Sequence, residues 1–294
     1  MACSLDRRRF LGNTMLAGGA CLVGVHATHA KVPDPPKLKK AVVFGMLNKL
    51  PADDRFKMAR DLGFEGVEAY TTEDPKEAEQ LRAAADKAGI AIHSVMNSNH
   101  WDNALSSDDP KKIAAGLQGM ETSLRNAKAF GADTVLLVPA VVKGEVTHEQ
   151  AWERSRTHIP KLIPLAAELG VIIAIENVWN NFLLKSDEFV RYVDEFKSPS
   201  VRAYFDVGNI VRYGEPQDWI RALGKRIVKI HVKDFDKTAS KFVPLRDGSV
   251  DWPAVHAALS EVGYNGWITA ELSGGDEAYL REVSARMDKI VAGQ

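Results

Sequence analysis

Residues 168–176 read Glu-Leu-Gly-Val-Ile-Ile-Ala-Ile-Glu, and the order of these residues decides the fold. Glu168-Leu169 is typical of a helix end, and Gly170 supplies the left-handed residue that closes a helix at low cost. The apolar run that follows is rich in Ile and barely alternates with polar residues, so it predicts a strand covered on both faces. The run ends on a carboxylate, Glu176.

The same unit of helix end, glycine and apolar run recurs along the chain. Five more glycines separate a helical stretch from an apolar run: Gly63, Gly89, Gly131, Gly224 and Gly263. With two further apolar runs, the predicted strands are residues 41–46, 66–70, 90–96, 134–138, 171–176, 201–206, 227–232 and 267–272. Helical patterns lie between them, for example at 53–62, 111–130, 149–169 and 252–262.

Eight strands that alternate with helices predict an α/β fold, a single-domain (β/α)8 TIM barrel. The alternative is an open doubly wound sheet. That fold would normally place a glycine-rich phosphate loop after its first strand, and residues 45–48, Gly-Met-Leu-Asn, do not form one.

The first thirty residues have the composition of a targeting segment. Arg7-Arg8-Arg9-Phe10-Leu11 is followed by an uncharged run to Val25 and by small residues at Thr28 and Ala30. We therefore expect a twin-arginine-type signal peptide over residues 1–30, a proline-containing linker over 31–39 and the barrel over 40–294. This layout predicts an exported, periplasmic protein. Both cysteines lie in the signal segment, so the mature chain would hold neither a disulfide nor a zinc–thiolate site.

The composition is that of an ordinary globular protein, with 45% hydrophobic and 26% charged residues and a formal net charge of −1. A near-neutral chain gives no reason to expect nucleic acid as a partner. After the signal segment, no stretch is apolar enough to span a bilayer, so we expect no membrane association once the signal is removed.

Four side chains that can bind a metal stand at the ends of four consecutive predicted strands. They are three carboxylates and one imidazole: Glu176, Asp206, His231 and Glu271. The carboxyl ends of barrel strands converge at one mouth, where three carboxylates would repel one another unless a cation lay between them. The sequence therefore predicts one divalent metal ion. Mn²⁺ is our first choice, and Mg²⁺, Co²⁺ or Zn²⁺ suit the same ligands.

The motifs around these residues resemble a known family. They are Ala174-Ile-Glu-Asn-Val-Trp179, Tyr204-Phe-Asp-Val-Gly-Asn209, Lys229-Ile-His-Val-Lys-Asp234 and Thr269-Ala-Glu-Leu272. The chain is similar over roughly residues 40–290 to the sugar phosphate isomerase/epimerase branch of the xylose isomerase-like TIM barrels. The resemblance implies that Glu176, Asp206, His231 and Glu271 are metal ligands and that Glu176 and Glu271 also transfer protons.

That implied chemistry is a metal-dependent sugar isomerase or epimerase reaction. A metal that binds a ketose carbonyl and its neighbouring hydroxyl acidifies the shared C–H bond and stabilises the enediolate. One carboxylate removes the proton, and the position to which a proton returns decides between epimerisation and isomerisation. The expected partner is a sugar or keto-sugar, and because sugar phosphates are chiefly cytoplasmic, export favours unphosphorylated ones.

Further residues near the predicted mouth are candidates for contact with the sugar. They are His100, Trp101, Trp179, Asn181, Asn209 and Lys233. Asn209 departs from the family pattern, because related ketose epimerases carry a substrate-binding histidine three residues after the aspartate of strand six. Lys233 could instead pair with Asp206 or Asp234, and Glu68 could orient the site or form a buried ion pair. We expect His93 to be a core residue and Asp276 to cap a helix over 277–291.

Three alternative functions stay open at this stage. The same proton removal in a 3-keto-glycoside could expel a leaving group, which would make the protein a lyase or hydrolase. A phosphodiesterase of the apurinic-endonuclease type would need more histidines, including one at position 209. A non-catalytic sugar-binding protein would keep its sugar affinity without metal. Barrels of this kind often form homodimers, so a homodimer is a further expectation.

Overall fold

The computed structural model of the chain describes residues 34–47 and 50–294, and we discuss only these. The predicted signal peptide and the first three residues of the predicted linker, 31–33, lie outside the described residues. The described residues belong to one compact unit, residues 33–294. Within it, none of the helices is both long and apolar enough to cross a membrane.

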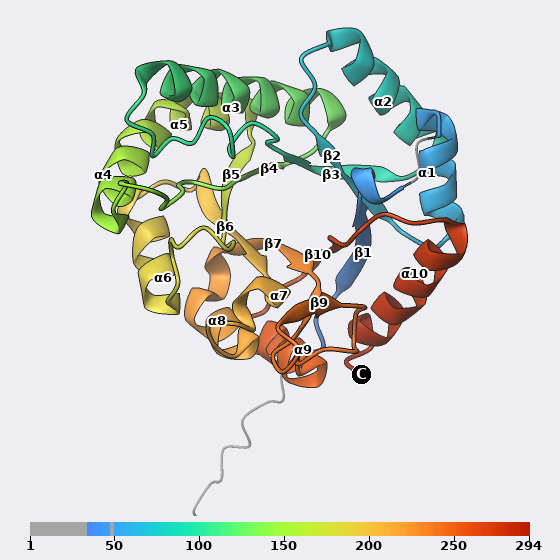
Figure 1. Cartoon of the computed structure of the whole chain (residues 1–294). Coiled ribbons are helices and arrows are strands. Elements are labelled where there is room, and N and C mark those ends of the chain that lie inside the picture. The colour runs from blue at the N-terminus through green and yellow to red at the C-terminus, as the bar shows by residue number, and fades with distance from the viewer. Residues whose placement is uncertain (1–33, 48–49) are drawn as a thin grey trace, which may run out of the picture. The chain divides into compact units, whose positions relative to one another are not determined.

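Eight parallel strands close into a barrel in the order β1-β10-β7-β6-β5-β4-β3-β2, which confirms the predicted fold (Figure 1). Their side chains are largely buried, as expected for strands that pack on a filled interior and on a ring of helices. The bounds of these strands are β1 Leu38–Val43, β2 Gly66–Tyr70, β3 Ala91–Met96, β4 Thr134–Leu137, β5 Ile172–Glu176, β6 Val201–Asp206, β7 Ile227–Val232 and β10 Gly266–Ala270.

Helices ring the barrel and connect its strands (Figure 1). They are α1 Ala52–Asp61, α2 Pro75–Ala88, α3 Pro110–Phe130, α4 His148–His158, α5 Ile163–Leu169, α6 Ser186–Glu195, α7 Val207–Ile210, α8 Pro216–Leu223, α9 Trp252–Glu261 and α10 Glu277–Val291. Short 3-10 turns cover Phe44–Met46, Ile159–Lys161 and Gly224–Arg226. All six glycines of the repeated unit have positive φ, as the sequence pattern predicts. Asp276 caps α10 by accepting from the Tyr279 N–H, also as predicted.

Most predicted bounds differ from the structure by one or two residues, and two elements differ by more. The first strand begins at Leu38 and ends at Val43, because Phe44–Met46 turns into a 3-10 helix. The long helix expected over 149–169 is divided into α4 and α5 by a 3-10 turn. Pro160 and Pro164 lack the N–H that a continuous helix would need at these positions.

A small two-stranded antiparallel sheet follows β7 and was not predicted. Its strands are β8 Asp234–Asp236 and β9 Lys241–Val243. The sheet is separate from the barrel sheet and lies within the connection between β7 and α9. It therefore adds a wall beside the end of β7 without changing the barrel.

The base of the barrel is closed by core packing and one ion pair. His93 is buried, stacks on Trp267 with ring centroids 4.7 Å apart, and lies within hydrogen-bond distance of the Thr269 hydroxyl at 3.1 Å, so it is a core residue as expected. Lys229 is buried on β7 and its Nζ lies 2.7 Å from Oδ1 of Asp133, which immediately precedes β4. These contacts belong to the end of the barrel opposite the predicted site.

Candidate metal and sugar site

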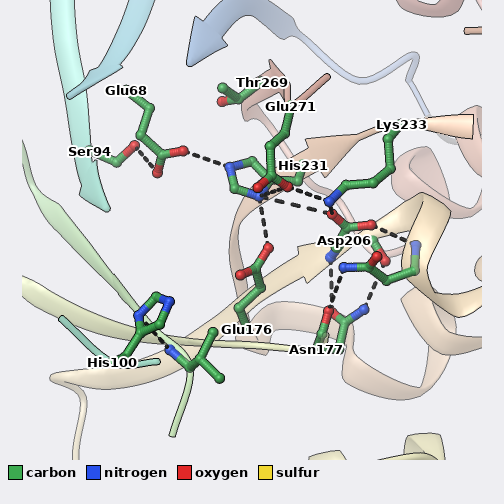
Figure 2. Close-up of polar contacts among 12 residues, drawn as sticks. Glu68, Ser94, His100, Glu176, Asn177, Asp206, His231, Lys233, Thr269 and Glu271 are labelled. Atoms are coloured by element: carbon green, nitrogen blue, oxygen red, sulfur yellow. Dashed lines mark hydrogen bonds and ion pairs between the residues drawn. The ribbon is translucent and has the colours of Figure 1, made fainter. Parts of the chain in front are cut away.

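The structure brings the four predicted metal-binding side chains together at the barrel mouth. One ligand-type atom from each of Glu176, Asp206, His231 and Glu271 lies within 4.8 Å of the others. Nδ1 of His231 is the centre of this group, at 2.8 Å from Oε1 of Glu176, 3.1 Å from Oε2 of Glu271 and 4.0 Å from Oδ2 of Asp206. Figure 2 shows Glu176, Asp206 and Glu271 converging on one side of the imidazole.

The pairing of neighbouring barrel strands explains this convergence. Asp206 and His231 are direct partners in the β6–β7 register, and Thr269 pairs with His231 in the β7–β10 register. Glu271 follows β10 and its backbone N–H donates to the carbonyl of Val232. The four side chains therefore start from adjacent strand ends on a closed sheet, which holds their spacing.

Glu68 lies on the other side of the imidazole. Its Oε2 is 2.6 Å from Nε2 of His231, and its Oε1 accepts a hydrogen bond of 2.8 Å from Ser94 (Figure 2). Glu68 is fully buried on β2. A carboxylate that accepts a hydrogen bond from Nε2–H fixes the ring and directs Nδ1 toward the acidic group, where Nδ1 can bind a metal once it gives up its proton. Glu68 thus forms a buried ion pair with His231, one of its two predicted roles, and through that contact it can also fill the other and orient the imidazole.

Lys233 is the cation nearest to the acidic group. Its Nζ lies 2.9 Å from Oδ2 of Asp206 and also contacts Oε2 of Glu271. Burial alone would lower the pKa of Lys233, but Asp206 and Glu271 outweigh it and raise this pKa. The salt bridge to Asp206, which was one of two expectations for Lys233, is present.

The two glutamates of the site have pKa values shifted in opposite directions. Burial raises the pKa of Glu176 to about 7, even though His231 opposes that shift. Burial also acts on Glu271, but Lys233 and His231 outweigh it and lower the pKa of this carboxyl well below its usual range. Burial would lower the pKa of His231, whereas Tyr204, Glu271 and Glu68 raise it well above its usual value. The group thus attracts positive charge, as a proton or as a cation.

The residues present fit a divalent metal ion. Oδ2 of Asp206 and Oε2 of Glu271 are buried and take no well-directed hydrogen bond, although both lie against the Lys233 ammonium. Three carboxylates and one oriented imidazole form a donor set suited to Mn²⁺, Mg²⁺, Co²⁺ or Zn²⁺. The group can therefore hold a metal.

Asn177 and Asn209 position Asp206, and Asn177 was not singled out from the sequence. Asn177 accepts from the Asp206 N–H at 2.9 Å and donates to the Asp206 carbonyl at 2.8 Å. The backbone N–H of Asn209 donates to Oδ1 of Asp206 at 2.7 Å, and its side chain donates to the Asn177 carbonyl at 3.1 Å. The Asn209 amide nitrogen is thus bonded within the protein.

The other predicted sugar-binding residues lie further out. His100 is buried, Figure 2 draws no contact between it and the acidic group, and burial lowers its pKa to about 4. Trp101 is 53% exposed and packs edge-on against His100. Trp179 donates from Nε1 to the Asn209 carbonyl at 2.9 Å, and Asn181 donates to the Val142 carbonyl at 3.3 Å. Their roles toward a sugar stay predictions.

A pocket of about 420 Å³ opens beside Glu271 and Lys233. Its remaining lining comes from β9 and the residue after it, from the segment that follows β10, and from the first turn of α10: Phe242, Val243, Pro244, Leu272, Ser273 and Tyr279. Glu271 is the member of the acidic group that reaches this space, and its side chain is 28% exposed. A ligand in the pocket would therefore meet Glu271 before the more deeply buried Glu176.

The protein is thus a closed (β/α)8 barrel with three carboxylates and one imidazole at its mouth, and this group can hold a cation. The chain belongs to the xylose isomerase-like TIM barrel family, whose model matches residues 56–290. The resemblance seen in the strand-end motifs is thus confirmed.

Relatives with assigned names are carbohydrate epimerases. The chain is 26% identical over 276 residues to the L-ribulose-5-phosphate 3-epimerase UlaE of Salmonella paratyphi A, covering 86% of this chain and 97% of that protein. The same enzyme of Escherichia coli O1:K1 is also 26% identical over 276 residues, with the same coverage. At this level of similarity the chain is sugar 3-epimerase-like.

Solved structures share the fold at lower identity. The D-psicose 3-epimerase of Clostridium cellulolyticum H10, solved with D-tagatose, superposes with a TM-score of 0.73 at 18% identity, covering 86% of this chain and 98% of that chain. The 3-keto-D-glucoside 4-epimerase of E. coli gives a TM-score of 0.75 at 14% identity, covering 86% and 99%.

Proposed function

We propose that this protein is a metal-dependent sugar epimerase or isomerase that moves a proton next to a ketose carbonyl. The observation that carries the proposal is the convergence of two glutamates on one oriented imidazole, with Asp206 completing the group. Two carboxylates at one reacting centre can remove a proton and return one.

The proposed ligands of the metal are Glu176, Asp206, His231 and Glu271, with Mn²⁺ as the preferred ion. When bound, such an ion polarises a carbonyl and its neighbouring hydroxyl and so acidifies the C–H bond between them. Glu68 keeps the His231 ring in the orientation that directs Nδ1 to this site.

The two glutamates have different surroundings, which suggests different tasks. Glu271 lines the pocket and contacts Lys233, so it meets the substrate C–H as an ionised carboxylate and serves as the base. Glu176 lies behind it at the end of β5 and contacts His231. We assign to Glu176 the return of a proton to the substrate.

Lys233 is positioned to hold a substrate oxygen. Its ammonium lies in the pocket wall and already neutralises Asp206 and Glu271. A carbonyl or hydroxyl oxygen that enters the pocket could accept a hydrogen bond from this ammonium, which can only donate. His100, Trp101, Trp179, Asn181 and Asn209 remain proposed contacts with the rest of the sugar.

We also propose that the protein is exported by its twin-arginine-type segment, acts in the periplasm as a homodimer and takes free rather than phosphorylated sugars. The arginine pair, the uncharged run and the small residues before position 31 support export. Fractionation of cells that express the full chain would test it, and a protein found only in the cytoplasm would contradict it.

The reaction is tested by metal analysis followed by incubation with free and phosphorylated ketoses in deuterated water. We expect one equivalent of divalent metal and deuterium at the carbon next to the carbonyl, with or without net epimerisation. Removal of the metal by a chelator should abolish exchange, and added Mn²⁺ should restore it. A protein that binds sugar equally well without metal and exchanges no hydrogen would be a sugar-binding protein instead.

A further inference from the structure

Two large aromatic side chains are exposed beside the pocket and have no task in the proposed proton transfer. Phe242 on β9 is 45% exposed and Trp179, which follows β5, is 37% exposed. Their rings stack on each other with centroids 4.9 Å apart and planes 27° apart. With the buried Phe235 beneath them, these three residues form what we call the aromatic shelf.

The aromatic shelf is held in place from several sides. Phe235 meets Trp179 edge-on at 5.2 Å and Phe242 at 5.4 Å. The indole N–H of Trp179 donates to the Asn209 carbonyl, and the Arg212 guanidinium lies 5.1 Å from the Trp179 ring centroid. Exposed aromatic rings with fixed orientation offer a flat apolar surface at low entropic cost to a ligand.

Asp234 anchors the hairpin that carries Phe235 and Phe242. This fully buried carboxylate accepts hydrogen bonds from the backbone N–H groups of Phe235, Arg246 and Val250 and from the indole of Trp252. Several of these bonds are 2.8–3.1 Å long. The hairpin is thus attached to the segment before α9 at one buried point directly after the end of β7.

The aromatic shelf is continuous with the proposed reaction site. Phe242 lines the same 420 Å³ pocket as Glu271 and Lys233, and the Lys233 ammonium lies 5.8 Å from the Phe242 ring centroid. This volume falls within the roughly 300–1,000 Å³ of sites that enclose drug-sized ligands. When the reacting carbon of a sugar lies at Glu271, a group attached to that sugar can occupy the side of the pocket next to Phe242.

We propose that the aromatic shelf is a second subsite, which binds a ring linked glycosidically to the reacting sugar. The substrate class is then a keto-glycoside rather than a free ketose, and the linked ring presents a flat apolar face to Phe242. A pyranose and an aryl group both have such a face. This inference rests on the proposed function for the position of the reacting sugar, but it concerns binding and can be measured without turnover.

The test compares paired methyl and phenyl β-glycosides of glucose, galactose and mannose, with cellobiose as the sugar-linked counterpart. Binding to the Mn²⁺-loaded full chain is measured by calorimetry. In at least one pair we expect the phenyl member to bind about five- to ten-fold more tightly than the methyl member, the ratio expected for one stacked ring. Tighter binding of cellobiose than of methyl glucoside would identify a sugar as the linked ring, and preference for phenyl alone would identify an aryl group.

Phe242→Ala should reduce this ratio to near one, and Phe242→Leu should retain only part of it because it keeps bulk but loses the flat face. Leu50→Ala is the matched control, since Leu50 is also 45% exposed but does not line the pocket. The ratio in this variant should equal that of the unmodified protein.

A ratio near one for every pair in the unmodified protein, or a ratio that persists in Phe242→Ala, would overturn the subsite. Deuterium exchange into a free ketose, together with phenyl-to-methyl ratios near one for every glycoside pair, would support the proposed reaction while rejecting the aromatic shelf as a subsite.

Discussion

Lys229 and Lys233 stand four residues apart around β7, yet they lie at opposite ends of the barrel and in opposite electrostatic environments. Lys229 is buried near the base with one partner, Asp133, whose side chain is 68% exposed. Lys233 lies at the mouth against Asp206 and Glu271. Burial lowers the pKa of Lys229, whereas at Lys233 the two carboxylates outweigh burial and raise the pKa.

The two lysines differ in the number of carboxylates that surround them. At the base, one cation meets one carboxylate that water already solvates. At the mouth, Glu68, Glu176, Asp206 and Glu271 share two cationic side chains, Lys233 and His231. Of these two places among the described residues, the mouth therefore keeps negative charge that can bind a metal ion, and the base does not.

The largest expected effect is on activity at the mouth. Glu271→Gln keeps the shape of the side chain and one ligand oxygen but removes the base, so deuterium exchange should fall by at least ~10²-fold. Asp133→Asn is the matched change at the base and should leave the exchange rate within about two-fold, because Asp133 precedes β4 at the opposite end of the barrel from the acidic group. Near-normal exchange in Glu271→Gln would reject Glu271 as the base.

The next effect is on metal affinity through the residue that orients His231. Glu68→Gln keeps the size but weakens the hold on Nε2, so Mn²⁺ affinity should fall by about 10- to 100-fold, as is usual for such partners of metal-binding histidines. Ser94→Ala removes one hydrogen bond to Glu68 and should have a smaller effect. Both are measured by metal titration, and an unchanged affinity in Glu68→Gln would show that Glu68 has no positioning role.

Metal binding should also depend on pH. Glu176 has a pKa of about 7 in the metal-free protein, so a proton competes with the metal below that pH. The apparent dissociation constant for Mn²⁺ should rise up to about tenfold for each pH unit below about 7. A Glu176→Gln variant should lose the part of this dependence that comes from Glu176 and keep the part that comes from the proton on His231, and a flat profile in the unmodified protein would contradict the assignment.

The same shift has a consequence for the stability of the metal-free protein. The folded-state pKa of Glu176 is raised from its ordinary value of 4.5, so the folded chain holds this proton more tightly than the unfolded chain. Its contribution to the free energy of unfolding is therefore present below about pH 4.5 and is lost as pH rises toward about 7. Chemical unfolding of the chelated protein across this range measures the loss, and added Mn²⁺ should reverse it.

The smallest effect is expected at the base. Lys229→Met replaces a buried ammonium by an apolar chain of similar length and leaves only the exposed Asp133, so the free energy of unfolding should change by no more than about 1 kcal/mol. Lys233→Met instead leaves Asp206 and Glu271 facing each other, and should lower the melting temperature of the metal-free protein clearly more. Saturating Mn²⁺ should restore most of that loss, and equal melting temperatures for the two variants would remove the contrast between the two ends.

Much of the fold and the acidic group could be predicted because both follow from short-range rules. The glycines after helices mark where strands begin, and parallel strands in a barrel must bring their carboxyl ends together. Glu176, Asp206, His231 and Glu271 were therefore predictable as neighbours from strand ends alone. The break at Pro160 and Pro164 was also visible in the sequence, although the apolar pattern favoured one helix.

Other features depend on contacts between distant residues that no local pattern encodes. The hairpin of β8 and β9 has strands of only three residues, and its position is set by the bonds of Asp234 to residues up to 18 positions away. The choice between a positioning role and an ion pair for Glu68 depends on a contact across 163 residues. Asn177 was missed because its role is visible only in its reciprocal hydrogen bonds with Asp206.

The hairpin after β7 also bears on how this protein could change over evolutionary time. It forms no strand pair with the barrel sheet, and Asp234 fixes its first residue, so the residues beyond Asp234 can vary without disturbing the strand pairing of β7. If the aromatic shelf is the proposed second subsite, a different hairpin grafted between Asp234 and Trp252 would change which glycosides bind and would leave the acidic group in place. Insertions at this connection are therefore a natural route by which one ancestral barrel could give rise to enzymes for many different sugars.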